Sequence, residues 1–177
     1  EVGDEPAEPY EGIEVGFSSL AIGREETYAF VEDVLREVAT ITPGPYLHLG
    51  GDESLATTDA DFLAFIARAT AIASRFGKTL VGWHEMGRSR ELPAGTVGQY
   101  WSFTTPQEGA AEHTLSFVEQ GGSVILSPAD VAYLDIKYAE HDELGLLWAE
   151  GPTTLQASYD WEPTAIIPGL DESQILG

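Results

Sequence analysis

Two adjacent acidic residues, Asp52 and Glu53, follow a pair of glycines at the end of a short apolar segment. Carboxyl groups can bind the hydroxyl groups of a ligand or move protons. Trp83 and Trp101 end the next two apolar segments along the chain. Indole rings offer a large apolar face on which a sugar ring can stack, so the combination predicts a carbohydrate site.

These features also have ordinary structural interpretations. Two glycines before an acid often mark only a tight turn, and a tryptophan at the end of a strand is often a core residue. Tyr133 and Asp135 could be a pair on a surface loop. The segment Gly50–Glu53 also matches the start of a nucleotide-cyclase signature, but Ser54 stands where that signature continues with Phe. No single feature therefore decides the function, and only their joint occurrence is informative.

The histidine and cysteine content argues against a metal site. The histidines are His48, His84, His113 and His141. They show none of the spacings typical of zinc ligands, and His84-Glu85 matches only the first half of the H-E-x-x-H motif. The chain has no cysteine, which excludes thiol nucleophiles, disulfides and cysteine-bound zinc. We expect neither a metal ion nor an organic cofactor. A hydrolase with a metal held by His48, Asp52 and His84 is a minor alternative.

The net charge of the chain narrows the class of its ligands. The formal net charge is −22, from 30 acidic and 8 basic residues. A surface this acidic repels nucleic-acid phosphates and anionic membranes, so we expect neither as a partner, whereas neutral sugars are compatible with it. No apolar run reaches the roughly 18 residues of a membrane-spanning helix. The acidic surface and the low lysine content suggest a secreted, extracellular bacterial protein.

Alternating helices and strands must position the candidate residues. Apolar periodicity and breaker residues predict helices over 25–39, 58–76 and 107–120, and strands over 46–49, 79–83, 96–101 and 123–127. Residues 1–23 read as irregular, and those after 127 as aromatic-rich loops. The alternation favours a parallel α/β sheet, in which the carboxyl ends of the strands form the functional edge. Four strands are too few to close a (β/α)8 barrel, which takes about 250 residues.

One segment resembles the H-x-G-G-D-E signature of glycoside hydrolase family 20, the β-N-acetylhexosaminidases: Tyr46-Leu47-His48-Leu49-Gly50-Gly51-Asp52-Glu53. Further segments resemble the family and follow in its order: 14–17, 81–84, 99–101, 125–128, 133–138 and 159–163. The likeness covers almost the whole chain, and a joint match of this kind is highly specific. It implies an exo-acting hydrolase that removes terminal, non-reducing β-linked N-acetylglucosamine or N-acetylgalactosamine.

The resemblance implies a substrate-assisted, retaining mechanism, in which the 2-acetamido oxygen of the sugar is the nucleophile. Glu53 would be the general acid/base that protonates the leaving oxygen. Asp52 would orient the acetamido group, and Tyr133 would hydrogen-bond its carbonyl. Neighbouring residues on a strand point to opposite faces, so Asp52 and Glu53 are not expected to form the facing carboxyl pair of the common retaining glycosidases.

The resemblance also implies a set of sugar-contacting residues. Trp83 and Trp101 would wall the acetamido pocket. Asp135 and Trp148 would contact the far side of the terminal sugar, near its hydroxymethyl group. His48 would support the two acids from behind, without touching the sugar.

Residues 1–177 are expected to be one segment of a longer family 20 catalytic domain. The resemblance implies a partial (β/α)8 TIM barrel that holds the middle-to-late strands and helices. The N-terminal strands and the final pocket segment would come from the remainder of the barrel. Alone, such a segment is expected to bind sugar poorly and could lack activity. A carbohydrate-binding remnant without turnover is the main alternative, although the presence of Glu53 favours an enzyme.

Overall fold

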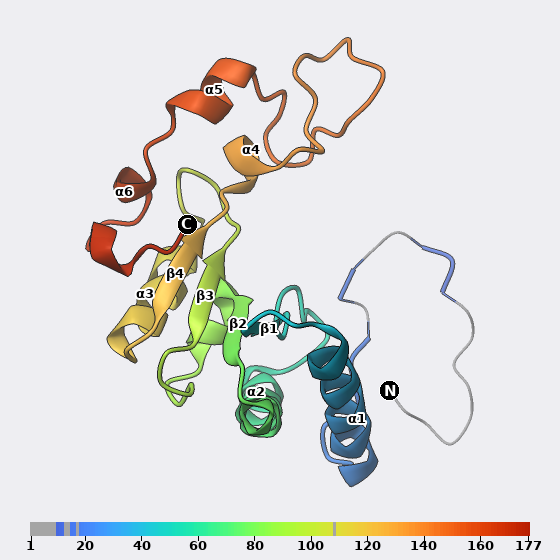
Figure 1. Cartoon of the computed structure of the whole chain (residues 1–177). Coiled ribbons are helices and arrows are strands. Elements are labelled where there is room, and N and C mark those ends of the chain that lie inside the picture. Colours follow the sequence, from blue (N-terminus) through green and yellow to red (C-terminus); the bar gives the residue numbers. More distant parts are fainter. Residues whose placement is uncertain (1–9, 13–14, 17, 108) are drawn as a thin grey trace.

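A four-stranded sheet forms the centre of the structure, a computed structural model that describes residues 10–12, 15–16, 18–107 and 109–177. The strands are β1 (Tyr46–His48), β2 (Thr79–Trp83), β3 (Val97–Tyr100) and β4 (Ser123–Leu126), and they lie side by side in chain order (Figure 1). Short apolar runs with β-branched residues suit strands that are covered on their faces. Glu14 and Phe17, which belong to one of the family-like segments, lie outside the described residues.

The register of the sheet brings the strand ends to one edge. Val81 of β2 pairs with His48 of β1 and with Val97 of β3, and Tyr100 of β3 pairs with Leu126 of β4. Every one of these pairings is parallel, so the predicted parallel α/β architecture is confirmed. The carboxyl ends of the four strands therefore open on the same side of the molecule.

Three longer helices accompany the sheet: α1 (Glu25–Ile41), α2 (Asp59–Ala73) and α3 (Ala110–Glu119) (Figure 1). Crossovers between parallel strands are right-handed, which places the connecting helices on one face of the sheet. Phe62 and Ile66 of α2 and Phe117 of α3 are almost fully buried, and they share one apolar cluster with Met86 and Val124. These helices and the strands agree with the predicted ranges to within three residues at each end.

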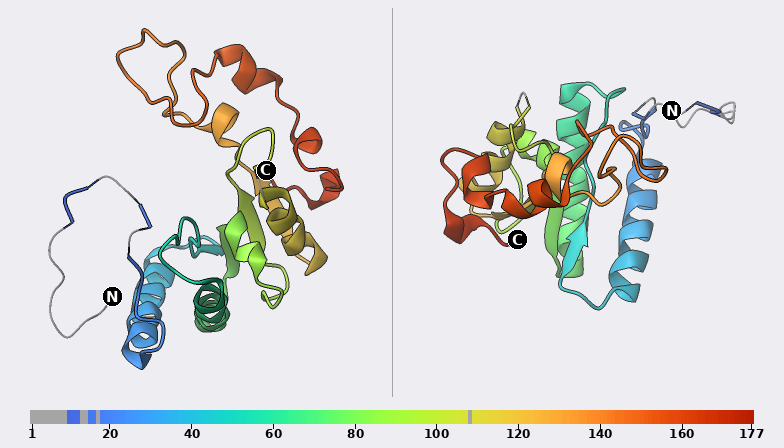
Figure 2. Two further views of the ribbon diagram at one scale, coloured as in Figure 1. Left: turned by 180° about the vertical axis from the view of Figure 1, so that it is seen from behind. Right: turned by 90° about the horizontal axis from the view of Figure 1, so that it is seen from above.

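The chain after β4 differs from the loops that the sequence predicted. It contains α4 (Ala129–Ala132), α5 (Leu155–Asp160), α6 (Pro163–Ile166) and the 3-10 turn η3 (Glu172–Gln174), and further 3-10 turns are η1 (Ser74–Phe76) and η2 (His84–Arg88). The side chains of Thr154 and Glu162 accept hydrogen bonds from the first turns of α5 and α6. Helices of four to six residues are too short to show an amphipathic period, which is why the prediction was wrong there. Figure 2 shows α1 (blue) and α6 (red) on opposite sides of the molecule.

The two edges of the sheet differ in their pairing. Next to β4, Ile175 forms a parallel bridge with Val124, and the Leu176 N–H donates to the Val124 carbonyl at 2.8 Å. At the other edge, β1 pairs with β2 alone among the described strands, with Leu47 buried and Tyr46 exposed. A parallel strand could therefore add next to β1, whereas residues 175–177 already pair with β4.

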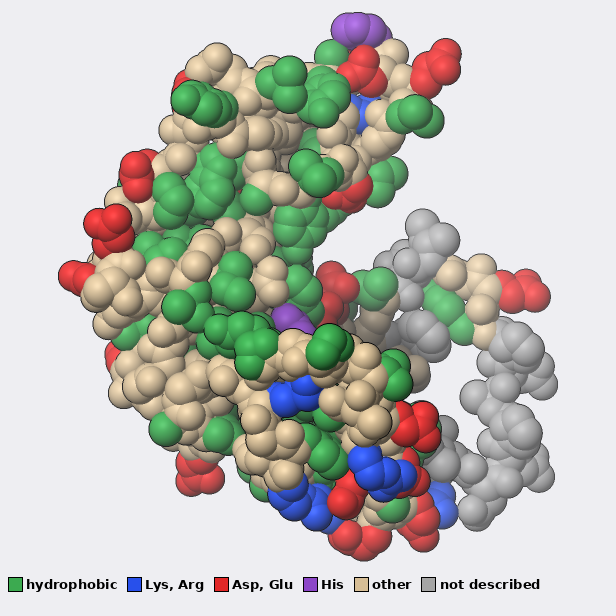
Figure 3. All heavy atoms as spheres, viewed as in Figure 1, with side chains coloured by type: hydrophobic (Ala, Val, Ile, Leu, Met, Phe, Trp, Pro, Cys, Tyr) green, Lys and Arg blue, Asp and Glu red, His purple; other side chains and the backbone are tan. Residues whose placement is uncertain are grey.

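Charged side chains gather over α1 and α2 at one end of the molecule (Figure 3). Arg68 pairs with Glu25 at 2.6 Å and Arg75 pairs with Glu32 at 3.0 Å, so two ion pairs bridge these helices. All four side chains are exposed, and exposed ion pairs contribute little to stability. None of the described helices combines the length and the apolar composition that crossing a membrane requires.

Candidate active site

A tight turn at the end of β1 presents the two acidic residues. Gly50 and Gly51 adopt φ values of 75° and 104°, and Glu53 adopts 44°. The Gly50 carbonyl accepts a hydrogen bond from the Trp83 N–H at 2.9 Å, which joins the turn to the end of β2. A Cβ atom on Gly51 would lie 2.5 Å from Cγ of Met86, so both the backbone conformation and the space require glycine there.

Asp52 and Glu53 both border one hollow, in contrast to the strand geometry expected for them. Strand alternation ends at His48, and the positive φ values that follow rotate the chain so that both side chains reach the same space. A positive φ at a residue other than glycine costs about 1–3 kcal/mol and is most often found at functional sites. The Glu53 carbonyl accepts the Leu55 N–H at 2.8 Å, which helps to hold this conformation.

The hollow has a volume of about 280 Å³ and is lined by six side chains: Asp52, Glu53, Trp83, Trp101, Tyr133 and Trp148. They come from the ends of β1, β2 and β3 and from the segment after α4. The volume is close to the lower end of the range for small-molecule sites, about 300–1,000 Å³. Two carboxyl groups, a phenol and three indoles make a site that can stack on a sugar ring and also move a proton.

An arm after α4 supplies the outer part of the site. Ile136 and Leu146 form a parallel bridge, and the Leu146 N–H donates to the Asp135 carbonyl at 2.7 Å. The Asp135 carboxylate accepts the indole N–H of Trp148 at 2.8 Å, and the rings of Tyr133 and Trp148 meet edge to face at 5.5 Å. Tyr133 and Trp148 line the hollow directly. Asp135 does not line it and contacts it only through its hydrogen bond with Trp148.

The phenol of Tyr133 is suited to donate a hydrogen bond. Burial raises the pKa of Tyr133, and the negative charges of Asp135, Asp52, Glu85 and Glu53 raise it further. A higher pKa keeps the hydroxyl group protonated over the whole physiological range. The Tyr133 hydroxyl group can thus donate a hydrogen bond to an acceptor in the hollow.

His48 lies behind the turn, at the open edge of the sheet. Its Nδ1 accepts the Gly50 N–H at 3.0 Å, and its ring contacts Trp83 with the centroids 4.8 Å apart. This partial burial lowers the pKa of His48, although a hydrogen bond with Gln99 and the charge of Asp52 oppose the shift. The amide of Gln99 in turn donates to the Ser127 hydroxyl at 3.0 Å. The Gln99 side chain thus joins β3 to Ser127, the residue that follows β4.

Glu85 is a carboxyl group close to the site, and no role beyond half of a zinc motif was predicted for it. Both of its carboxylate oxygens lie 3.0 Å from the indole nitrogen of Trp101, and its side chain is 19% exposed. Burial raises the pKa of Glu85, hydrogen bonds from its own backbone and from Trp101 oppose this, and the charges of Asp52 and Glu53 raise it further. The available signal was its place directly after the strand end at Trp83-His84.

His84 is the most buried of the histidines, and its environment favours the neutral ring. Burial lowers its pKa to about 4, and the nearby His113 adds to the shift. Its Nδ1 atom makes no hydrogen bond within the part of the chain that the structure describes, and it lies 3.5 Å from a Glu85 oxygen. In the same described part, no three His, Asp or Glu side chains are grouped closely enough to hold a metal ion. His48, Asp52 and His84 therefore do not form the ligand set of the metal-dependent alternative.

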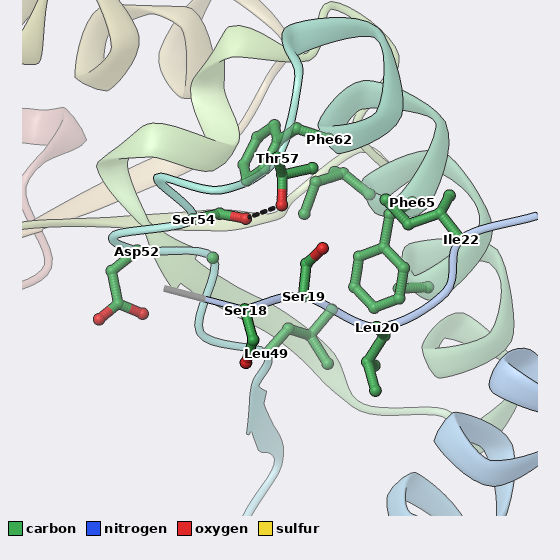
Figure 4. Close-up of a pocket in the computed structure, with 13 residues that line it drawn as sticks. Ser18, Ser19, Leu20, Ile22, Leu49, Asp52, Ser54, Thr57, Phe62 and Phe65 are labelled. Atoms are coloured by element: carbon green, nitrogen blue, oxygen red, sulfur yellow. Dashed lines mark hydrogen bonds between the residues drawn. The ribbon is translucent and has the colours of Figure 1, made fainter. Parts of the chain in front are cut away.

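A second hollow, of about 220 Å³, lies on the other side of the Asp52 turn (Figure 4). Phe62 and Phe65 of α2 and Leu20 give it an apolar lining, and Asp52 lies at its edge with the carboxylate directed away from the two phenyl rings (Figure 4). The lining of this hollow is mostly apolar, so the chemistry of the site belongs to the first hollow.

Comparison with known protein sequences points to one family. The profile of the family described as "Glycosyl hydrolase family 20, catalytic domain" matches residues 5–60 and 54–177. The chain is 40% identical over 176 residues to a β-N-acetylhexosaminidase of Cellulomonas fimi, in an alignment that covers 98% of this chain and 34% of that protein.

Solved structures give the same result. The chain is similar to a glycoside hydrolase family 20 β-N-acetylglucosaminidase with 52% identity and a TM-score of 0.88, over 98% of this chain and 37% of the other. It is also similar to a mutant Streptomyces plicatus β-hexosaminidase in complex with its product GlcNAc, with 43% identity and a TM-score of 0.87, over 95% of this chain and 33% of the other.

The extent of these matches defines the architecture. The chain spans about a third of the length of these relatives. Its four parallel strands and their helices correspond to a part of the (β/α)8 barrel of these enzymes, so the predicted partial barrel is confirmed. The family profile covers nearly all of the sequence and the relatives agree with it, and this chain therefore belongs to glycosyl hydrolase family 20.

Proposed function

We propose that this chain forms part of the active site of an exo-acting β-N-acetylhexosaminidase, which removes terminal β-linked N-acetylglucosamine or N-acetylgalactosamine. One observation carries the proposal: Asp52, Glu53 and Tyr133 border a single hollow together with three tryptophans. The family and the printed names of the relatives support the same substrate class.

The proposed reaction uses the acetamido group of the substrate as its nucleophile. The acetamido oxygen bonds to the anomeric carbon while the bond from that carbon to the leaving oxygen breaks. The proton of the Glu53 carboxyl group passes to the leaving oxygen. Water then attacks the anomeric carbon and gives its proton to the Glu53 carboxylate, and the bond to the acetamido oxygen breaks. Both steps invert the anomeric carbon, so the product retains the starting configuration.

Asp52 and Tyr133 stabilise the charge that forms in the first step. The acetamido group becomes positively charged as its oxygen attacks, and the adjacent carboxylate of Asp52 interacts favourably with that charge. The phenol of Tyr133 holds the acetamido oxygen in line with the anomeric carbon. Trp83 and Trp101 wall the acetamido group, and the pair of Asp135 and Trp148 contacts the outer side of the sugar.

The remainder of the barrel completes this site in the proposal. The chain spans about a third of the relatives' length, and the β1 edge of its sheet can accept another strand. We call the longer polypeptide that would contain these residues the parent enzyme. No metal ion or organic cofactor takes part in the proposed steps.

A comparison of two chromogenic substrates tests the proposal. The parent enzyme should hydrolyse a nitrophenyl N-acetyl-β-glucosaminide, and it should leave the matching β-glucoside almost untouched because that sugar lacks the nucleophile. Glu53→Gln should lower kcat by about 100- to 10,000-fold, the range for loss of a general acid/base. Glu37→Gln, at an exposed position of α1, is the matched control and should be unaffected.

Two results would contradict the proposal. Rapid hydrolysis of the β-glucoside would exclude assistance by the substrate. Sugar binding by the parent enzyme with no turnover, unchanged in Glu53→Gln, would favour a carbohydrate-binding protein instead.

A further inference from the structure

Glu85 lies behind one wall of the hollow rather than in its lining. The indole of Trp101 forms that wall, and its nitrogen is equidistant, at 3.0 Å, from both Glu85 oxygens. The indole N–H is the one polar group that a tryptophan side chain can use, and it is a donor only. The Glu85 carboxylate accepts this hydrogen bond and so restrains the rotation of the Trp101 ring about its side-chain bonds.

The other contacts of Trp101 and Glu85 leave little freedom to either. The His84 ring packs on Trp101 with centroids 5.7 Å apart, and His84 is 6% exposed. His84 also contacts Tyr100, which is fully buried. Glu85 is the second residue of the 3-10 turn η2, which follows β2 directly, so its backbone lies close to the end of the sheet. The acceptor is thus held rigidly, which allows it to define a position for the ring.

We propose that Glu85 is a positioning residue that sets the place of the Trp101 wall and thereby determines which N-acyl groups the site accepts. The inference rests on the proposed function, because the wall matters only if an N-acyl group lies against it. With the hydrogen bond in place, the wall leaves room for an acetyl group and excludes longer acyl chains. Without it, the ring can rotate away, and the site loses its fit to acetyl and its rejection of larger groups.

Kinetics of the parent enzyme on substrates that differ by one methylene tests this role. The substrates are nitrophenyl β-glucosaminides with N-acetyl and N-propionyl groups. A pocket typically distinguishes one methylene by about 10- to 200-fold in kcat/KM. Glu85→Ala should raise KM for the N-acetyl substrate and should bring the two kcat/KM values at least about tenfold closer together. Glu85→Gln keeps an acceptor oxygen and should preserve most of the discrimination, while Glu85→Asp, with a withdrawn acceptor, should be intermediate.

A merely structural role predicts a different result. If Glu85 only satisfies a buried N–H group, Glu85→Ala should lower Tm and kcat for both substrates by the same factor. An unchanged ratio of the two kcat/KM values would then overturn the proposal. If Glu85→Ala does not fold, the ratio of the two kcat/KM values is compared between Glu85→Asp and Glu85→Gln. Equal ratios in these two variants would also overturn the proposal.

Fluorine NMR of the ring provides a readout without turnover. The parent enzyme is labelled with 5-fluorotryptophan, and Trp101→Phe assigns the Trp101 resonance. Glu85→Asp should shift or broaden that resonance, and Glu85→Gln should leave it near its original place. A Trp101 resonance that ignores both substitutions would overturn the inference even if the enzyme hydrolyses N-acetylglucosaminides. A parent enzyme that shows the expected spectra but no such hydrolysis would refute the proposed function alone.

Discussion

Asp52, Glu53 and Glu85 bring three carboxyl groups to the ends of two neighbouring strands, in unlike surroundings. Asp52 and Glu53 are exposed and border the hollow, whereas Glu85 is mostly buried and bonded to an indole. Burial raises the pKa of Glu85, and the two other carboxylates add to the shift. Glu85 therefore takes up a proton at a higher pH than an ordinary glutamate, while it still has an oxygen that accepts from Trp101.

His84 should make stability depend on pH between about 4 and 6.5. Its pKa is lowered from 6.5 to about 4 in the fold, mainly by burial, so in this range the unfolded chain binds a proton that the folded chain does not. The contribution is complete above pH 6.5 and is lost as the pH falls towards 4, at about 1.4 kcal/mol per pH unit and about 3 kcal/mol in all.

Thermal unfolding of the parent enzyme checks this contribution. Wild type and His84→Gln are compared at pH 7 and at pH 4.5, and the fall in Tm between the two should be smaller in the variant because it lacks the titrating ring. His141→Gln is the matched control, since its side chain is 88% exposed. Equal falls in Tm for wild type and both variants would count against a buried neutral His84.

At the scale of elements, the turn after β1 decides where the acids point. The Gly50 carbonyl and His48 Nδ1 tie it to Trp83 of β2 and, through Gln99, to β3. These contacts cross strands, so the turn is held by the sheet and not by its own sequence alone. The positive φ at Glu53 is maintained in the same way.

A glycine on each side of β1 gives a matched pair of substitutions. Gly51→Ala should destabilise the parent enzyme by about 1–3 kcal/mol or more, since its φ is 104° and a Cβ would meet Met86. Gly44→Ala should be nearly neutral, because its φ is not positive and nothing lies within 4 Å of the added atom. Chemical unfolding measures both, and kcat should fall only for Gly51→Ala. Equal stability of the two variants would show that the turn is not constrained as described.

At the scale of the whole molecule, the net charge of −22 sets up repulsion that the few ion pairs cannot offset. The described ion pairs between α1 and α2 are exposed, and such pairs contribute little to stability. Self-repulsion of a highly charged chain destabilises its compact state. Screening should therefore stabilise the fold, although it weakens the individual ion pairs.

Salt should accordingly raise the Tm of this chain. The Debye length falls from about 10 Å at 0.1 M to about 3 Å at 1 M ionic strength, which removes most of the repulsion between distant carboxylates. Scanning calorimetry at sodium chloride concentrations from about 0.05 to about 1 M measures the effect, because the Debye length falls severalfold over this range. Sorbitol is the uncharged control. A Tm that stays constant or falls with salt would mean that the ion pairs dominate.

The sequence by itself determined the parallel α/β plan and the residues at the strand ends. Apolar runs, helical periodicity and the segment from Tyr46 to Glu53 are local patterns, and local patterns can be recognised from the sequence without the fold. The predicted site residues line one hollow or touch its lining. Parallel strands end on one side of a sheet, which brings the residues at their ends together.

Only the tertiary structure decided how these residues meet. The bond between Glu85 and Trp101 and the bond between Asp135 and Trp148 join residues 16 and 13 positions apart, and no local pattern encodes them. The positive φ of Glu53 and the short helices after β4 were likewise not predicted from the sequence. The physical reason is that side-chain contacts across strands are selected by packing and hydrogen bonding in three dimensions, while a sequence shows its periodicity only along the chain.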